Sequence, residues 1–108
     1  MTARALRDGT DRVLLERLTE TGFLASECGL HGEAEQLLAA LADVKPDIPF
    51  PLVGLAIVRA RSGRLEQAID ELRQLIVSYP DCEIAKASLG MLMVQANQAG
   101  AAELFNEV

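Results

Sequence analysis

The sequence has little of three things: aromatic residues, cysteine and positive charge. Of its 108 residues, three are Phe, one is Tyr and none is Trp. Aromatic and β-branched residues favour β-strands, whereas Leu and Ala, which dominate here, favour helices. A β-sandwich is therefore disfavoured, and we predict an all-α fold. A chain of this length has room for one domain, because two separate cores would each bury too little apolar surface.

Cysteine is scarce and has no motif around it. Cys28 and Cys82 are far apart in the chain, and neither has a CxxC partner or a histidine at metal-ligand spacing. We predict unpaired, buried thiols in a reducing compartment, with a redox or metal role as the alternative.

Positive charge is also short. Ten basic residues stand against sixteen acidic ones, which gives a formal net charge of −6. The basic residues are scattered, so no stripe of them could replace the counterions of a nucleic acid. Anionic membrane surfaces are disfavoured for the same reason. We therefore predict that nucleic acid is not among the partners.

Long hydrophobic runs are missing as well. The longest uncharged stretch, residues 87–102, contains Gln95, Asn97 and Gln98, whereas a membrane-spanning helix needs about 20 apolar residues. The first 13 residues lack the apolar run of a signal peptide. We expect a soluble protein that is not inserted into a membrane and not exported by the general secretory route.

What the sequence does contain is an internal repeat with a period of 34 residues. Five pairs of identical residues share this register: Gly29 and Gly63, Ala34 and Ala68, Leu38 and Leu72, Leu41 and Leu75, and Pro46 and Pro80. The same register leads from Ala68 to Ala102, so a third, incomplete unit is expected.

Each repeated position has a physical meaning in a helical hairpin. Small residues at Gly22, Ala56 and Gly90 allow one helix to approach its partner closely. Gly29 and Gly63 suit a tight turn between helices, and a proline after the second helix ends it, because proline cannot donate the next hydrogen bond. The pattern predicts antiparallel pairs of helices.

We predict six helices, the last one short, at about 11–28, 31–44, 49–61, 65–78, 82–96 and 99–107. They form a domain over residues 11–108, with repeats at about 15–48, 49–82 and 83–108. Residues 1–10 show little periodicity and are expected to be loosely ordered, with an extension of the first helix as the alternative.

With glycine, alanine and proline at these offsets, the sequence resembles tetratricopeptide repeat (TPR) proteins over roughly residues 15–108. Within that superfamily it is similar to the small three-repeat chaperones and accessory proteins of bacterial type III secretion systems. Three segments carry this likeness: GFLASECGLHGEAEQLLAAL, PLVGLAIVRARSGRLEQAIDELRQL and AELFNEV. The resemblance implies a right-handed superhelix of hairpins and a bacterial cytoplasmic protein that holds a small secretion subunit through its amphipathic helix.

The resemblance also implies which side chains bind the partner, because the first helix of each TPR hairpin lines a concave face. The expected partner-binding residues are Phe23, Phe50, Val53, Ile57, Ile84, Met91 and Val94. Thr19 lies on the same face, and Glu16 and Glu27 would make one end of it acidic. The absence of Lys, Arg and Asn there argues against capture of a free C-terminal carboxylate. Alternatively, some of these side chains complete the core or contact the N-terminal segment.

No constellation for catalysis is found in the sequence. His31 is the single histidine, has no acid at triad spacing and is predicted to be a solvated turn residue. Phosphate-binding glycine loops and metal-ligand clusters are missing, so we predict no enzymatic activity, no cofactor and no metal. The alternative to a chaperone is a structural homo-oligomer, such as a homodimer that pairs through the same face, or a fragment of a larger TPR scaffold.

Overall fold

The computed structural model describes the backbone of residues 10–107 and the side chains of residues 12–97. Over this range it contains five helices and no strand: α1 (Thr10–Glu27), α2 (His31–Val44), α3 (Phe50–Arg61), α4 (Leu65–Ser78) and α5 (Glu83–Glu107). The predicted all-α class is confirmed, and the first four helices begin and end within a residue of the predicted bounds. The expectation of a loosely ordered N-terminal segment concerns residues 1–9, which lie outside the described range, and Thr10, which begins α1.

The prediction of six helices is wrong, because α5 runs from Glu83 to Glu107 without a break. The first helices of the other two hairpins, α1 and α3, end two residues before Gly29 and Gly63, whose φ angles are 88° and 95°. The 34-residue register places Asn97 at the equivalent position, and Asn97 is helical. With neither glycine nor proline there to interrupt the helix, its hydrogen bonding continues.

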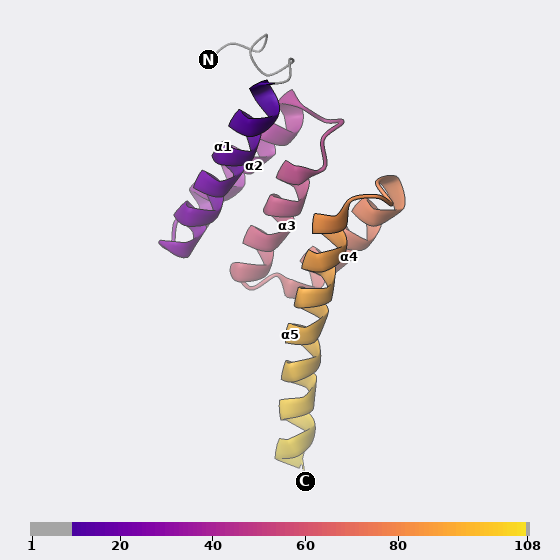
Figure 1. The fold of residues 1–108 in the computed structure, drawn as a ribbon. Coiled ribbons are helices and arrows are strands. Elements are labelled where there is room, and N and C mark those ends of the chain that lie inside the picture. The colour runs from indigo at the N-terminus through magenta and orange to yellow at the C-terminus, as the bar shows by residue number, and fades with distance from the viewer. Residues whose placement is uncertain (1–9, 108) are drawn as a thin grey trace.

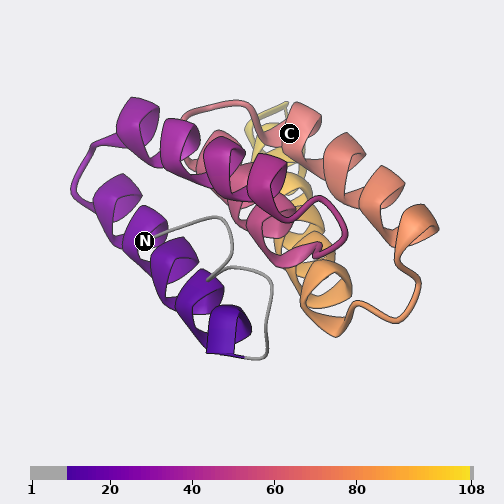
Figure 2. The same cartoon turned by 90° about the horizontal axis from the view of Figure 1, so that it is seen from above.

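The helices form two layers, with α1, α3 and α5 in one and α2 and α4 in the other (Figures 1 and 2). The central helix is α3, which contacts all four of the others. Half of its residues are buried, and its sequence FPLVGLAIVRAR is apolar around most of its circumference. A helix that is hydrophobic on all sides is stable only when it is surrounded by other elements. The predicted right-handed superhelix stays a prediction.

Two apolar clusters hold the layers together. One joins α1, α2 and α3 through Leu15, Ala34, Leu38, Leu41, Leu55 and Val58. The other joins α3, α4 and α5 through Val53, Ala56, Ala68, Ile69, Leu72, Leu75, Ala85 and Leu92. The repeated alanines and leucines of the sequence thus form equivalent parts of two successive cores.

Small residues set the distance between helices. A Cβ atom added at Gly22 would lie 3.1 Å from Leu38 Cγ, so α1 and α2 approach closely there as predicted. The corresponding prediction for Gly90 is wrong within the described structure, because a Cβ at Gly90 would meet nothing within 4 Å. A close approach that we did not predict occurs at Gly54, where an added Cβ would lie 3.0 Å from Thr19 Cγ2 and 3.2 Å from Phe23 Cζ. Gly54 brings α3 against α1.

Candidate functional site

The seven residues expected to bind a partner come from the α1, α3 and α5 layer, and the structure divides them into three groups. Ile84, Met91 and Val94 on α5 are 45%, 48% and 55% exposed. Phe23 on α1 and Phe50 and Ile57 on α3 are half-buried. Val53 is 1% exposed and belongs to the core around α3. Its place in the predicted binding set is therefore revised, because a side chain buried to this extent offers no surface to a partner.

Two pairs of these residues are brought together across the layer. Ile57 and Met91 line a small hollow of about 140 Å³ between α3 and α5. Phe50 and Ile84 line a second hollow of about 90 Å³, near the beginnings of α3 and α5 and closed on one side by Leu15 of α1. Sequence register alone could not show these pairings, since they depend on how α5 packs beside α3.

The α1 end of the face is more closed than predicted. Thr19 is buried, and its hydroxyl donates a hydrogen bond to the Leu15 carbonyl oxygen at 2.8 Å. The Phe23 ring lies over Gly54 at the contact between α1 and α3. These two side chains help to pack α1 on α3, so the accessible apolar surface belongs mainly to α5.

The predicted acidic end is partly neutralised. Arg61 Nη2 lies 3.6 Å from Glu27 Oε1, and Arg12 Nε lies 4.0 Å from Glu16 Oε1. All four side chains are largely exposed, so these pairs contribute little to stability. They do reduce the net negative charge that a partner would meet at this end.

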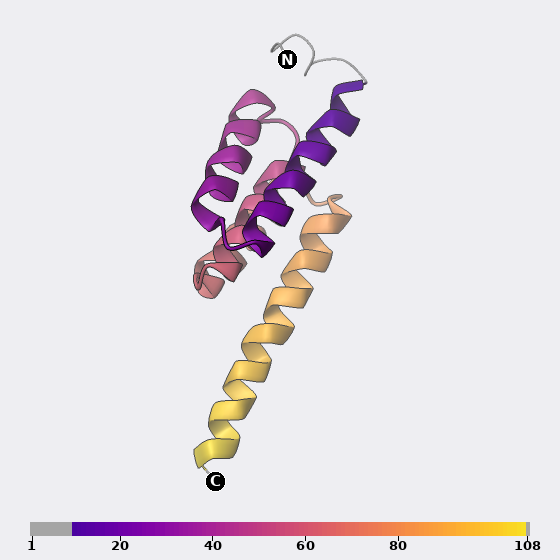
Figure 3. The same ribbon diagram turned by 90° about the vertical axis from the view of Figure 1, so that its left-hand side faces the viewer.

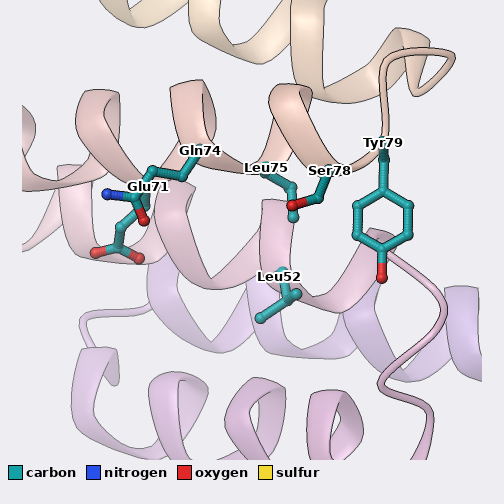
Figure 4. A pocket seen from close by; sticks show the side chains of 6 residues that line it. All are labelled: Leu52, Glu71, Gln74, Leu75, Ser78 and Tyr79. Carbon is teal, nitrogen blue, oxygen red and sulfur yellow. The ribbon is translucent and has the colours of Figure 1, made fainter.

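The opposite side of the molecule carries a groove that the sequence did not suggest. It has a volume of about 410 Å³ and is lined by Leu52, Glu71, Gln74, Leu75, Ser78 and Tyr79 (Figure 4). At one end the Tyr79 hydroxyl donates a hydrogen bond to the Pro46 carbonyl oxygen at 3.1 Å, which ties the end of α4 to the loop after α2.

At the other end a network of charged side chains crosses three helices. Arg59 of α3 pairs with Glu35 of α2, at 3.0 Å, and with Glu71 of α4. Arg64 also binds Glu35, at 2.7 Å. The hydrogen bonds from Arg64 and then from Arg59 hold the pKa of Glu35 below its usual value. The second carboxylate oxygen of Glu71 is buried and finds no hydrogen-bond partner in the described part of the chain.

This network links the two layers and the two hairpins. Sequence reasoning assigned no interaction to Arg59. Nothing in the local sequence reveals the network, because its members lie 24, 12 and 29 positions apart.

His31 and the two cysteines are the side chains that most resemble catalytic groups. His31 Nδ1 lies 2.8 Å from the hydroxyl of Ser26, which is buried. His31 itself is half-buried, so the prediction of a solvated turn residue is wrong; the pair fastens the turn between α1 and α2. Both cysteines are free thiols, but Cys28 is exposed and Cys82 half-buried, so the prediction of buried thiols is also wrong.

Among the side chains of residues 12–97, no group of three or more His, Cys, Asp or Glu could hold a metal ion. Over residues 10–107, no helix has both the length and the apolar character needed to cross a bilayer.

Comparison with known proteins gives one informative similarity. The chain is 37% identical, over 67 residues, to the TPR repeat-containing protein PA4667 of Pseudomonas aeruginosa. This match supports the TPR superfamily. It covers 62% of this chain but only 11% of that protein, so the chain spans about a tenth of its relative's length. No protein-family model matches the sequence. No solved structure matches it either.

Proposed function

We propose that this protein is a non-catalytic scaffold that binds another protein through the apolar face of α5 and the adjoining hollows beside α3. The observation that carries the proposal is the exposed row of Ile84, Met91 and Val94, two of which line hollows shared with Phe50 and Ile57. Exposed apolar side chains that are grouped in this way usually mark an interaction site. The match to a TPR protein supports an interaction role in general.

The partner that fits this face is an amphipathic helix of a small protein. Ile84, Met91 and Val94 follow helical spacing along one side of α5, and each shared hollow could take one apolar anchor. A helix with apolar residues at similar spacing would pack along α5 and bury its own apolar stripe. The right-handed superhelix expected from the family would make this face concave.

A finer form of the proposal names the class of partner. The resemblance of three segments to type III secretion accessory proteins supports a chaperone of a bacterial type III secretion subunit, acting in the cytoplasm. Light scattering of the chain co-expressed with small proteins encoded near its gene would test this. A defined complex with a secretion subunit is the expected result, and binding only to proteins unrelated to secretion would contradict it.

The binding face itself is tested by one substitution and a matched control. Met91→Asp places a charge in a contact that excludes water, and it should weaken partner binding at least tenfold, since burying an unpaired charge costs several kcal/mol. Val77→Asp introduces the same charge at an 83% exposed position on α4 and should leave affinity unchanged. Titration calorimetry with the co-purified partner gives both affinities. Equal affinity for Met91→Asp and the unchanged chain would place the binding site elsewhere.

A second candidate is a repeat segment within a larger TPR scaffold. It is favoured by the match to PA4667, in which the similar segment is only 11% of the protein. In that case the apolar face of α5 would contact neighbouring repeats. Determining whether the gene encodes further repeats, and then measuring partner binding by the full-length product, separates this function from that of a free chaperone.

A further inference from the structure

The outer face of α5 lacks the helix that covers the equivalent face in the other two hairpins. The 34-residue repeat places a small residue at the same position of α1, α3 and α5. On α1 this residue is Gly22, and Leu38 of α2 packs against it. On α3 it is Ala56, which is buried in the cluster that contains Leu72 of α4. On α5 it is Gly90, which is exposed and has open space where a Cβ would lie. Met93, three residues further on, is also exposed.

The repeat itself shows what belongs on this face. Ala34 on α2 and Ala68 on α4 are fully buried residues of the covering helices. The register assigns Ala102 to the same position, so the covering helix of the third unit would begin near residue 99. In the structure residues 99–107 instead extend α5 in a straight line beyond the other helices (Figures 1 and 3). The chain therefore holds both an uncovered face and the segment suited to cover it, in an arrangement where they cannot meet.

We propose that two copies of this chain exchange these segments. Residues 98–107 of each copy lie antiparallel on the face formed by Leu89, Gly90 and Met93 of the other. The result is a twofold-symmetric dimer, which is the commonest closed arrangement of identical chains.

The register fixes where the two helices cross. In the first hairpin Gly22 meets Leu38, and the midpoint of this pair is residue 30, in the turn. Two repeats later the midpoint is residue 98. Two straight α5 helices that cross antiparallel at residue 98 give each copy the helix-on-helix contact that a closed hairpin would provide internally. Asn97 at the turn position favours the straight form, because asparagine adopts a positive φ less readily than the glycines at the other two turns, Gly29 and Gly63.

The helix dipole also favours the antiparallel arrangement. Residues 98–108 contain Glu103 and Glu107 and no basic residue. Each acidic end would lie toward the beginning of the other α5, where the helix dipole is positive. Lys86 adds little to this attraction, because it is already paired with Glu83 of its own helix. This surface differs from the proposed binding face, because Ile84, Met91 and Val94 follow a separate side of α5.

The test is molar mass by light scattering over a range of protein concentrations. The unchanged chain should show twice its mass of 11.6 kDa. Gly90→Leu fills the position where the exchanged helix must approach, and should halve the mass. Gly90→Ala is the matched control: the equivalent residue in the second repeat is Ala56, so this variant should stay dimeric. Asn97→Gly restores the residue found at the other two turns and should also halve the mass, by letting the hairpin close within one chain.

Circular dichroism of each variant shows whether it is folded. If Gly90→Leu does not fold, Asn97→Gly still tests the proposal. A monomeric unchanged chain at every concentration up to its solubility limit would overturn the proposal. So would a dimer that persists in both folded variants. Dissociation by Met91→Asp alone would show instead that two copies pair through the proposed binding face.

Discussion

Gly22, Gly54 and Gly90 all lie within helices, but their surroundings differ. Gly22 and Gly54 lie at helix contacts where an added Cβ would be within 3.0–3.1 Å of a neighbouring side chain. Gly90 faces open space in a single chain. Glycine costs a helix roughly 1 kcal/mol relative to alanine, so only the first two repay this cost within one molecule.

Alanine substitutions should therefore have opposite signs. Gly90→Ala should raise the free energy of unfolding by about 0.5–1 kcal/mol through helix propensity. Gly54→Ala should lower it by about 1 kcal/mol, because overpacking against the buried, β-branched Thr19 exceeds the propensity gain. Urea denaturation at equal protein concentration measures both changes. Stabilisation by Gly54→Ala as large as that by Gly90→Ala would mean that α1 and α3 are not in close contact.

Glu35 provides a prediction about pH. Arg64 and Arg59 lower the pKa of Glu35 in the folded state. Its contribution to stability is therefore fully present above the ordinary glutamate pKa of 4.5 and is lost as pH falls through the lower, folded-state pKa. At pH 7, Glu35→Gln should reduce the free energy of unfolding by about 1 kcal/mol, a value typical of a partly exposed ion pair. The difference between variant and unchanged chain should shrink toward pH 3 in urea titrations. A difference independent of pH would exclude the charge as its cause.

At the scale of elements, the first hairpin depends on a leucine of its second helix, which packs between α1 and α3. Leu38 of α2 is fully buried and touches both the Gly22 and Gly54 positions, on α1 and α3. Leu24, on α1, is 62% exposed.

Leu38→Ala should lower the free energy of unfolding by about 2–5 kcal/mol, the range for a cavity left by a buried leucine. Leu24→Ala removes the same atoms from an exposed site and should change the free energy of unfolding by less than about 0.5 kcal/mol. Thermal and urea unfolding followed by circular dichroism give both values. Similar losses in the two variants would contradict the close packing of α2 between α1 and α3.

At the scale of the whole molecule, the described structure extends 59 × 31 × 17 Å, and α3 is the element on which the others assemble. Amide hydrogen exchange should therefore be slowest in α3, since it opens only when contacts with all four other helices are lost. Mass spectrometry of peptides covering each helix measures this order. Slower exchange in α1 than in α3 would show that the first hairpin, and not the central helix, is the most stable unit.

The sequence by itself determined the helical class and the first four helices. These features depend on local properties: Leu and Ala favour helices, and glycine and proline at a fixed period end them. The same period also showed that Ala34 and Leu38 are equivalent to Ala68 and Leu72, and the structure buries the two pairs in two successive cores.

The tertiary structure alone decided which residues meet. Arg59 joins Glu35 and Glu71, Phe23 lies over Gly54, and Val53 is enclosed in the core, although sequence analysis predicted another role or none for each of them. It also decided that α5 passes Asn97 without a turn, which leaves Ile84, Met91 and Val94 exposed on one side and Gly90 uncovered on another. The physical reason is that burial and pairing depend on how helices from distant parts of the chain pack, whereas a repeat in sequence specifies only the local chain.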